Sequence, residues 1–244
     1  MPFSFRRPPS PDQFEIATDS GIVAVTLRRH ARARNYTLRL KSATGAPVLT
    51  MPKRGSLRQA RAFLDRHAGW LLREMDKLPK SEPIVDGATI PLRGIPHRIR
   101  HAPGRRGTVA VETGDDGAAL VVSGNAAHLR RRTIDFLKRE AKRDLEPLVM
   151  GYAEALGVAA TSIRLRDQTS RWGSCTATGR LSFSWRLIMA PPFVLDYLAA
   201  HEVAHLREMN HSRRFWRIVE QLCPHTRQAR AWLKSEGTTL HAVG

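Results

Sequence analysis

The sequence predicts an α+β protein in two parts, and three observations carry that prediction. Apolar and polar residues alternate with a period of two through much of residues 21–125. A single amphipathic helical stretch interrupts this pattern at residues 56–78. Beyond residue 126 the apolar spacing becomes three and four, and the motif HEVAHLREMNH occupies residues 201–211. We therefore expect a β-rich N-terminal domain with one helix, then a domain with a small sheet and a histidine-bearing helix.

The elements of the N-terminal half follow in order. Residues 1–20 are interrupted by proline and arginine and lack the apolar core of a secretory signal, so we predict a flexible leader. GIVAVTLRR and RNYTLRL alternate as strands do, and GAPVLTMP follows a Thr-Gly turn. In the helix, Ser56 is a suitable N-cap and Trp70 is expected to pack in the core. Short strands continue until the composition shifts, which places the accessory domain at 21–125.

The C-terminal domain, residues 126–244, begins with a long helix. Apolar spacing predicts this helix from about residue 127 to residue 156, with Gly157 as its stop. Its outward face is strongly basic. The cations are Arg130, Arg131, Arg132, Lys138, Arg139, Lys142 and Arg143. Such a run is usually a solvated face, and the alternative is a phosphate-binding surface. A hairpin with a turn at Thr178-Gly179 follows, and Pro191-Pro192 starts the next helix.

Composition limits the partners and the compartment. The chain of 244 residues has 40 Lys+Arg against 22 Asp+Glu, a net charge of +18, and this field attracts polyanions such as nucleic acid. An arginine-rich but evenly solvated surface is the alternative. No run approaches the roughly 18–20 apolar residues of a membrane span. The two cysteines, Cys175 and Cys223, are expected to be reduced thiols in a cytoplasmic protein.

The motif HEVAHLREMNH has the residues of a hydrolytic metal site. His201 and His205 are four residues apart, so on a helix both imidazoles lie on one face, as two zinc ligands require. Glu202 is adjacent and turned toward the open coordination position. Zinc lowers the pKa of bound water to about 7, and a neighbouring carboxylate takes the proton and passes it on. We therefore predict one zinc ion per chain, with Glu202 as the catalytic general base.

A catalytic zinc needs a third protein ligand, and the spacing favours His211. Six residues of continuous helix would rotate His211 by roughly 600° from His205, away from the ligand face, so the helix has to end between them. Asn210 is the expected breaker because asparagine tolerates the left-handed conformation, and Ser212 would cap the next helix. Glu208 is the rival third ligand. The alternative for the whole motif is a polar helix with satisfied histidines.

Several motifs resemble the YgjP-like family of metal-dependent hydrolases. They are RWGSC at 171–175, PPFVLDYLAAHEVAHL at 191–206 and NHSRRFW at 210–216, and the similarity extends back to about residue 21. That family is grouped with zincin metallopeptidases and is also labelled a UTP pyrophosphatase. The chain is more remotely similar to SprT-like proteases, which act on DNA-bound proteins. Metzincins share the histidine spacing but carry glycine at the position of Glu208, so we do not place the chain with them.

The resemblance implies a zincin-like fold for the C-terminal domain and a metal site in it. By this similarity the zinc ligands are His201, His205 and His211, and the general base is Glu202.

Residues near the motif suggest how a substrate is held. Trp172 and Gly173 would form an edge strand against which an extended substrate lies. Arg171 would hold a phosphate or carboxylate by a bidentate contact. Alternatively, Trp172 packs under the metal helix and Arg171 caps a carbonyl. Arg213 and Arg214 are the other candidates for binding an anionic substrate.

Three functions remain open at this point. The first is a zinc metallopeptidase in which a strand near residues 181–185 aligns a peptide by backbone pairing. The second is a nucleoside triphosphate (UTP) pyrophosphatase, which would need several cations converging on the metal. The third is a nucleic-acid-associated module whose footprint is the long basic helix. We prefer the zinc-dependent hydrolase and, within it, the peptidase.

Overall fold

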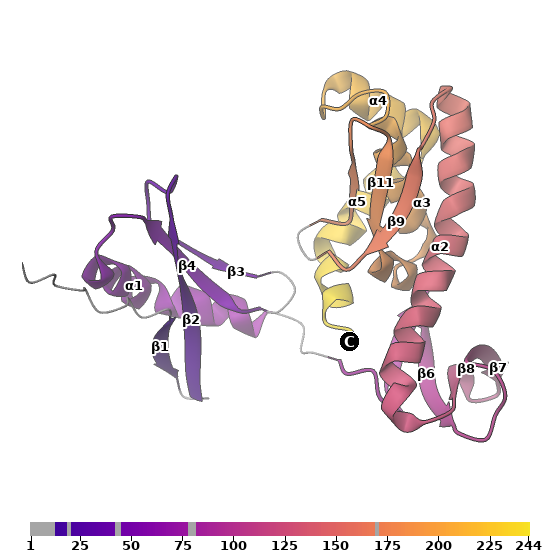
Figure 1. Ribbon diagram of the computed structural model, residues 1–244, viewed down its shortest axis with the longest axis horizontal. Coiled ribbons are helices and arrows are strands. Elements are labelled where there is room, and N and C mark those ends of the chain that lie inside the picture. The colour runs from indigo at the N-terminus through magenta and orange to yellow at the C-terminus, as the bar shows by residue number, and fades with distance from the viewer. Residues whose placement is uncertain (1–12, 19–20, 42–44, 78–81, 169–170) are drawn as a thin grey trace, which may run out of the picture. The chain divides into compact units, whose positions relative to one another are not determined.

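The structure is a computed structural model that describes residues 13–18, 21–41, 45–77, 82–168 and 171–244. The chain forms two compact units, Met1–Leu78 and Pro79–Gly244 (Figure 1). The first unit combines one helix with a mixed sheet, and the second combines several helices with two mixed sheets, so the α+β class is confirmed. Among the described residues, no helix has the length and apolar character needed to cross a membrane.

The first unit is a four-stranded sheet with one helix packed on it. Its elements are β1 (Gln13–Thr18), β2 (Gly21–His30), β3 (Thr37–Leu40), β4 (Pro47–Pro52) and α1 (Leu57–Asp76). The strand order is β1-β2-β4-β3, in which β2 and β4 are parallel and the other neighbours are antiparallel. Val25 and Leu49 of the sheet and Leu64 and Leu71 of the helix are fully buried in a core of their own.

Two features of the first unit differ from expectation. Residues 13–18, which the sequence placed in the leader, form β1 and pair with β2. The rest of that leader, residues 1–12 and 19–20, lies outside the described residues. Trp70 is 40% exposed, so the prediction that it packs in the core is wrong. Leu71 faces the sheet, and a helix turns by about 100° per residue, so Trp70 falls at the margin of the buried face.

The second unit begins with a sheet of the same topology. Its strands are β5 (Thr89–Leu92), β6 (Ile95–Ala102), β7 (Val109–Gly114) and β8 (Gly117–Ser123), in the order β5-β6-β8-β7. Here β6 and β8 are the parallel pair. A short 3-10 helix, η1 (Ala126–His128), leads into the long helix α2 (Leu129–Leu156). Gly157 ends α2 in the left-handed conformation with φ of 61°, as predicted.

The rest of the second unit carries the small sheet and the histidine helix. Strands β9 (Ser162–Arg166), β10 (Gly173–Cys175) and β11 (Arg180–Ser184) have the order β10-β11-β9. They are followed by η2 (Trp185–Met189), α3 (Pro192–Ala204), α4 (Arg213–Leu222), α5 (Thr226–Ser235) and η3 (Gly237–His241). Pro192 opens α3 and the Ser212 hydroxyl accepts a hydrogen bond from the Phe215 amide at the start of α4, both as predicted.

The predicted domain boundary at residue 125 does not coincide with the division between the units, which follows Leu78. The reason is a shared core. Ile99 of β6 is buried in one cluster with Leu137 of α2 and Val203 of α3. A period of two identifies a strand, but it does not say which core that strand joins.

Helix α2 connects the sheet of β5–β8 to the histidine helix. It contacts β7 and β8 near one end and β9, η2 and α3 along its length (Figure 1). Arg93, in the turn between β5 and β6, ties this sheet to the helix. Its guanidinium donates to Asp144 at 2.7 Å and to Glu140 at 2.9 Å. The sheet of β5–β8 is therefore part of the scaffold that positions α3.

Candidate metal centre

Helix α3 places three of the predicted site residues, and it is covered on several sides. It contacts α2, α4, α5 and β10. Because of this cover, Val194, Ala199 and Val203 are fully buried, and the helix has no solvated face along most of its length. His201 and Glu202 lie in its last turn, and His205 is its C-cap. A helix packed on several sides is a rigid base for functional side chains.

The end of α3 is not where the sequence predicted it. The helix ends at Ala204, whereas Asn210 was the expected breaker. Among the described non-glycine residues Arg93 alone has a positive φ, so Asn210 is not left-handed. The chain turns earlier because His205 Nδ1 donates to the carbonyl of Glu208 at 3.1 Å, which closes a turn over the imidazole. The turn nevertheless returns His211 to the site.

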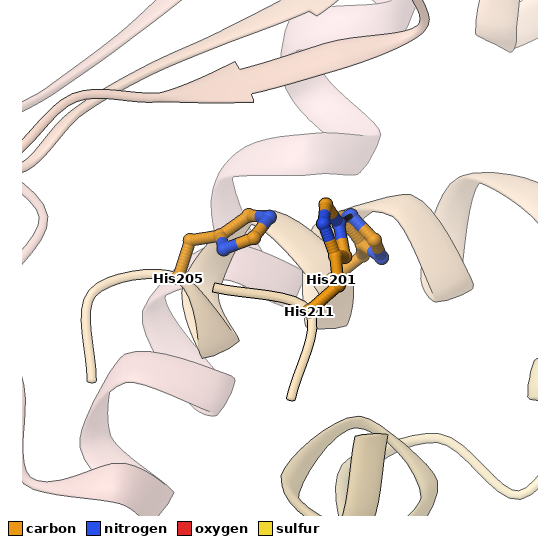
Figure 2. Close-up of side chains that lie close together, drawn as sticks. All are labelled: His201, His205 and His211. Atoms are coloured by element: carbon orange, nitrogen blue, oxygen red, sulfur yellow. Dashed lines mark hydrogen bonds between the residues drawn. The ribbon is translucent and has the colours of Figure 1, made fainter. Parts of the chain in front are cut away.

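The three predicted histidines converge. The ligand atoms of His201, His205 and His211 all lie within 4.8 Å of one another (Figure 2). The Nε2 atoms of His201 and His211 are 3.2 Å apart. Tetrahedral ligands at about 2.0–2.1 Å from zinc would lie roughly 3.3 Å from each other, so the distance between His201 and His211 fits two ligands of one metal ion. His211 is exposed while the other two are less so, which leaves the site open to solvent on one side.

Neighbouring groups orient the imidazoles. The bond from His205 Nδ1 to the Glu208 carbonyl requires the proton on Nδ1, which leaves Nε2 as a free ligand atom. Tyr197, one turn before His201, places its hydroxyl 3.3 Å from His201 Nδ1. The rival ligand Glu208 therefore contributes its backbone carbonyl, and its carboxylate is outside the histidine cluster.

Helix α4 supplies aromatic walls for the same cluster. Phe215 stacks on His205 with ring centroids 4.4 Å apart, and Trp216 stacks on His211 at 5.8 Å. The guanidinium of Arg230 from α5 lies over the Trp216 ring, at 4.3 Å from the ring centroid. These rings restrict imidazole motion and lower the local dielectric constant.

Burial keeps His201 and His205 neutral. It lowers the pKa of His201 to about 3, and the nearby His205, His211 and Arg230 act in the same direction. Burial also lowers the pKa of His205, although the bond to the Glu208 carbonyl opposes this. Neutral imidazoles are the form that binds a metal, so no proton has to be displaced from these two residues at neutral pH.

Glu202 is a buried carboxylate with an unsatisfied atom. The residue is 3% exposed, and its Oε2 has no hydrogen-bond partner among the described residues. Burial raises its pKa to about 8, and the charge of Arg171 opposes the shift. An unpartnered buried carboxylate is costly, which indicates a functional role for this position. A metal ion beside the histidines would suit this donor set.

Strand β10 passes directly over Glu202. A Cβ atom at Gly173 would lie 2.7 Å from the Glu202 Cδ and would overlap Oε1, so only glycine allows this approach. The strand is short, and its only described sheet neighbour is β11. Sequence reasoning identified Gly173 as part of an edge strand but missed its contact with the carboxylate. Only the packing of β10 on α3 reveals it.

Within the described part of the chain, one edge of β10 is not paired with another strand. The Trp172 carbonyl accepts from the Ser184 amide, and the Thr176 amide donates to the Arg180 carbonyl, so even-numbered residues pair with β11. In an antiparallel ladder the residues between them point the opposite way, which places the N–H and C=O groups of Gly173 and Cys175 on the open edge. β11, the strand near residues 181–185 expected to align a substrate, is central and paired on both sides, so that prediction is wrong.

The predicted substrate-binding residues lie in different environments. The Trp172 indole stacks on His241 with centroids 4.5 Å apart, so it packs against η3 rather than beneath the metal helix. Arg171 is exposed and close enough to Glu202 to affect its pKa. Arg213 and Arg214 are exposed in the first turn of α4, directly after the third histidine.

A groove adjoins the histidine cluster on the side of His205. Its volume is about 490 Å³, and apolar side chains and the turn after β10 form its walls. The lining includes Val158, Thr178, His205, Leu206 and Met209. The sequence showed no sign of this groove, because its walls come from three distant segments.

The thiols match expectation. Cys175 and Cys223 are both free. Burial raises the pKa of each thiol to about 11, so neither is a thiolate at neutral pH. This protonation state disfavours nucleophilic catalysis by Cys175, although its side chain lies near Glu202.

The residues assembled here define the class of the protein. A helix-borne histidine pair with an intervening glutamate and a third histidine nearby is the residue set of a metal-dependent hydrolase. The family described as "YgjP-like, metallopeptidase domain" matches residues 34–236, and the chain belongs to this family. The resemblance stated from the sequence is thereby confirmed.

Comparison with individual proteins adds little. Among solved structures the chain is similar to the crystal structure of the metallopeptidase zymogen of Pyrococcus abyssi abylysin. The identity is 23%, the TM-score is 0.34, and the match covers 38% of this chain and 95% of that one. No curated protein matches the chain.

Proposed function

We propose that the protein is a zinc-dependent peptidase. In this proposal His201, His205 and His211 hold one zinc ion, and Glu202 is the general base. The family assignment supports hydrolysis at a metal centre, and the convergence of three imidazoles supports the ligand set. Zinc held by three protein ligands supplies a Lewis acid and an activated water with a pKa of about 7.

The observation that carries the choice of a peptide is the position of β10. The face of β10 at Gly173 contacts the Glu202 carboxylate, and β10 has an unpaired backbone edge among the described residues. An extended peptide pairing with Gly173 and Cys175 would bring a backbone carbonyl beside the histidine cluster. Backbone pairing recognises an extended chain irrespective of its side chains, and a nucleotide has no such groups to offer.

In this proposal the residues around the histidine cluster have different roles in peptide hydrolysis. Glu202 accepts a proton and returns it to the leaving amine, and its buried position keeps its proton affinity in the range such a role needs. The Tyr197 hydroxyl and the Glu208 carbonyl orient His201 and His205. The groove beside His205 would receive a side chain next to the scissile bond, and its apolar walls favour an apolar one.

A nucleoside triphosphate (UTP) pyrophosphatase is the second candidate, and the cations near the site favour it. The charges of Arg171 and Arg230 reach Glu202 and His201 respectively, strongly enough to affect their pKa values. Arg213 and Arg214 could add to a phosphate-binding wall. However, the guanidinium of Arg230 is held over the ring of Trp216, at 4.3 Å from the ring centroid, so it already has a partner within the protein.

Substrate panels on zinc-loaded protein and its Glu202→Gln variant test the choice. We expect casein cleavage that falls by roughly 10²–10⁴ in the variant, because the variant loses the general base. Zinc content should stay equal, as measured by elemental analysis. Glu202-dependent release of pyrophosphate from nucleoside triphosphates, without proteolysis, would replace the peptidase by the pyrophosphatase.

A second pair of variants tests the role of β10. Gly173→Ala introduces a methyl group against Glu202, so we expect kcat on a peptide to fall at least about tenfold while zinc stays bound. Ser174→Ala is the matched control, because alternate residues of a strand point to opposite faces. If both variants had equal activity, β10 would no longer be evidence for a peptide substrate.

A further inference from the structure

The charges of the first unit are segregated along its sequence. Between Asp19 and Asp65 there is no aspartate or glutamate, whereas this stretch contains ten lysines and arginines. Eight of the ten are arginines, which bind phosphate bidentately more readily than lysines do. Of the ten, only Arg61 forms an ion pair among the described residues, with Asp65.

The fold gathers most of these cations at one end of the sheet. Because β2 and β4 are parallel, with His30 opposite Pro52, the loops that follow them leave the sheet at the same end. These loops and the adjacent strand and helix ends carry six exposed cations. They are Arg28, Arg32, Arg34, Lys53, Arg54 and Arg58, and we call them the basic edge.

Hydrogen bonds hold the two loops of the basic edge together. Arg29 donates to the carbonyls of Lys53 and Gly55, both at 3.0 Å. The Tyr36 hydroxyl donates to the Ser56 carbonyl at 3.2 Å. The two loops are therefore connected to each other, and this connection keeps their positive charges close together.

This arrangement costs stability in the isolated molecule. Like charges repel, and the first turn of α1 carries Arg58 and no acidic residue, although negative charge is favoured there. The Ser56 side chain makes no capping hydrogen bond either. A surface that opposes local electrostatic preference, and whose cations have no ion-pair partner within the described part of the chain, is typical of a binding site.

Residues 82–156 do not share this segregation of charge. The sheet and helix of residues 82–156 have the same topology but nearly balanced charges, twelve lysines and arginines against ten aspartates and glutamates. On α2, Arg131, Lys142 and Arg143 form ion pairs with acids of the same helix. The long basic helix, the expected nucleic-acid footprint, is thus partly neutralised.

The chemistry of the basic edge favours a phosphodiester backbone over a membrane. Within the described part of the first unit, Ile22 and Trp70 are the large apolar side chains that are exposed. Ile22 pairs with Ala17 at the opposite end of β2, and Trp70 lies more than three turns into α1. The edge therefore offers cations without the apolar anchors that membrane binding or a protein hot spot requires.

We propose that the first unit binds the phosphate backbone of nucleic acid through the basic edge, without reading the base sequence. The cations contact phosphates and release counterions, so binding weakens steeply with salt. Arg29 is a positioning residue that keeps the two loops adjacent. This site does not depend on which bond the metal centre cleaves.

Fluorescence anisotropy with the full chain tests the proposal. The probe is a labelled DNA duplex of about 20 base pairs and arbitrary sequence, titrated between about 50 and 200 mM salt. We expect the triple variant Arg32→Gln, Arg34→Gln, Arg54→Gln to lose at least about tenfold in affinity, with a salt slope lower by roughly three. The control triple Arg130→Gln, Lys138→Gln, Arg139→Gln removes the same charge from α2 and should change affinity less than about twofold.

Two further measurements show which nucleic acid is bound and whether loss of binding reflects loss of charge or misfolding. A single-stranded RNA of equal length shows whether DNA or RNA is preferred. The variant Arg32→Lys, Arg34→Lys, Arg54→Lys keeps the charge and should retain most binding. Equal losses in the two glutamine triples would overturn the proposal, because general charge would then explain the binding. So would duplex binding no tighter than binding to polyglutamate or phosphatidylserine vesicles of equal charge.

Discussion

Residues 13–77 and 82–156, which we call the first and second modules, have one topology and two electrostatic characters. Each has four strands, in which the second and fourth are parallel, followed by a helix that contacts the third and fourth. The first module has thirteen lysines and arginines against five aspartates and glutamates, and the second has twelve against ten. Topology therefore does not determine what a module is used for.

The modules also differ in what their helices contact. α1 packs within a core that belongs to the first unit alone. α2 is longer, and beyond its own sheet it contacts α3, which carries the histidines. The second module is thus part of the scaffold around the histidine cluster, whereas the first module has a core of its own. Variants that affect one module and not the other can test this division.

The largest expected effects come from the two cores. Leu137→Ala in α2 and Leu64→Ala in α1 each remove a fully buried side chain and should each cost about 2–5 kcal/mol of unfolding free energy. Only Leu137→Ala should also reduce zinc affinity and hydrolysis, because its cluster includes Val203 of α3. Calorimetry and activity on both variants measure this. Loss of hydrolysis in Leu64→Ala would show that the modules are not independent.

A smaller effect is expected from the ion pairs of the two modules. Arg93→Gln removes the guanidinium that joins Glu140 and Asp144 and leaves these carboxylates only the more exposed Arg143, so we expect a loss of about 1–3 kcal/mol of unfolding free energy. Arg61→Gln in the first module breaks an exposed pair with Asp65 and should cost less than about 0.5 kcal/mol. Chemical denaturation compares them. Equal losses would contradict the structural role of Arg93.

Removal of the cap at the start of α2 should lower the stability of the second unit. Asn125 Oδ1 accepts a hydrogen bond from the Ala127 amide at 2.8 Å at the entry to η1 and α2. Asn125→Ala should therefore destabilise the second unit by about 0.5–2 kcal/mol. Thermal unfolding measures the change, with Asn125→Asp as a control that keeps the acceptor. An unchanged midpoint for Asn125→Ala would show that the cap has no energetic role.

A substitution at the start of α1 should increase stability instead of lowering it, and this is the smallest change in stability that we expect. Arg58→Glu replaces an unfavourable cation in the first turn and should stabilise the first unit by about 0.3–1 kcal/mol. The same variant should weaken duplex binding, since it removes one cation of the basic edge and adds an anion. Thermal unfolding and anisotropy on one sample measure both. A variant that gains stability and keeps its affinity would separate Arg58 from the binding surface.

Several parts of the structure could be predicted because their signals are local. The proline start of α3, the Ser212 cap of α4 and the Gly157 stop of α2 each depend on residues adjacent in sequence. The histidine cluster was predictable for the same reason, since it lies within eleven residues. Asn210 was wrongly taken as the helix breaker: the helix ends before it, in a turn closed by hydrogen bonds from His205 Nδ1 to the Glu208 carbonyl and from the Glu208 amide to the Ala204 carbonyl.

The sequence by itself determined the α+β class, the histidine cluster with Glu202, and the absence of acids between Asp19 and Asp65. Tertiary structure alone decided that β5–β8 join the core of α2, that Gly173 contacts Glu202, and that the cations after β2 and β4 lie at one end of a sheet. The physical reason is how far apart in sequence the interacting residues are. Helix caps and ligand spacing depend on neighbours along the chain, whereas burial and charge clustering depend on packing between segments that are distant in sequence.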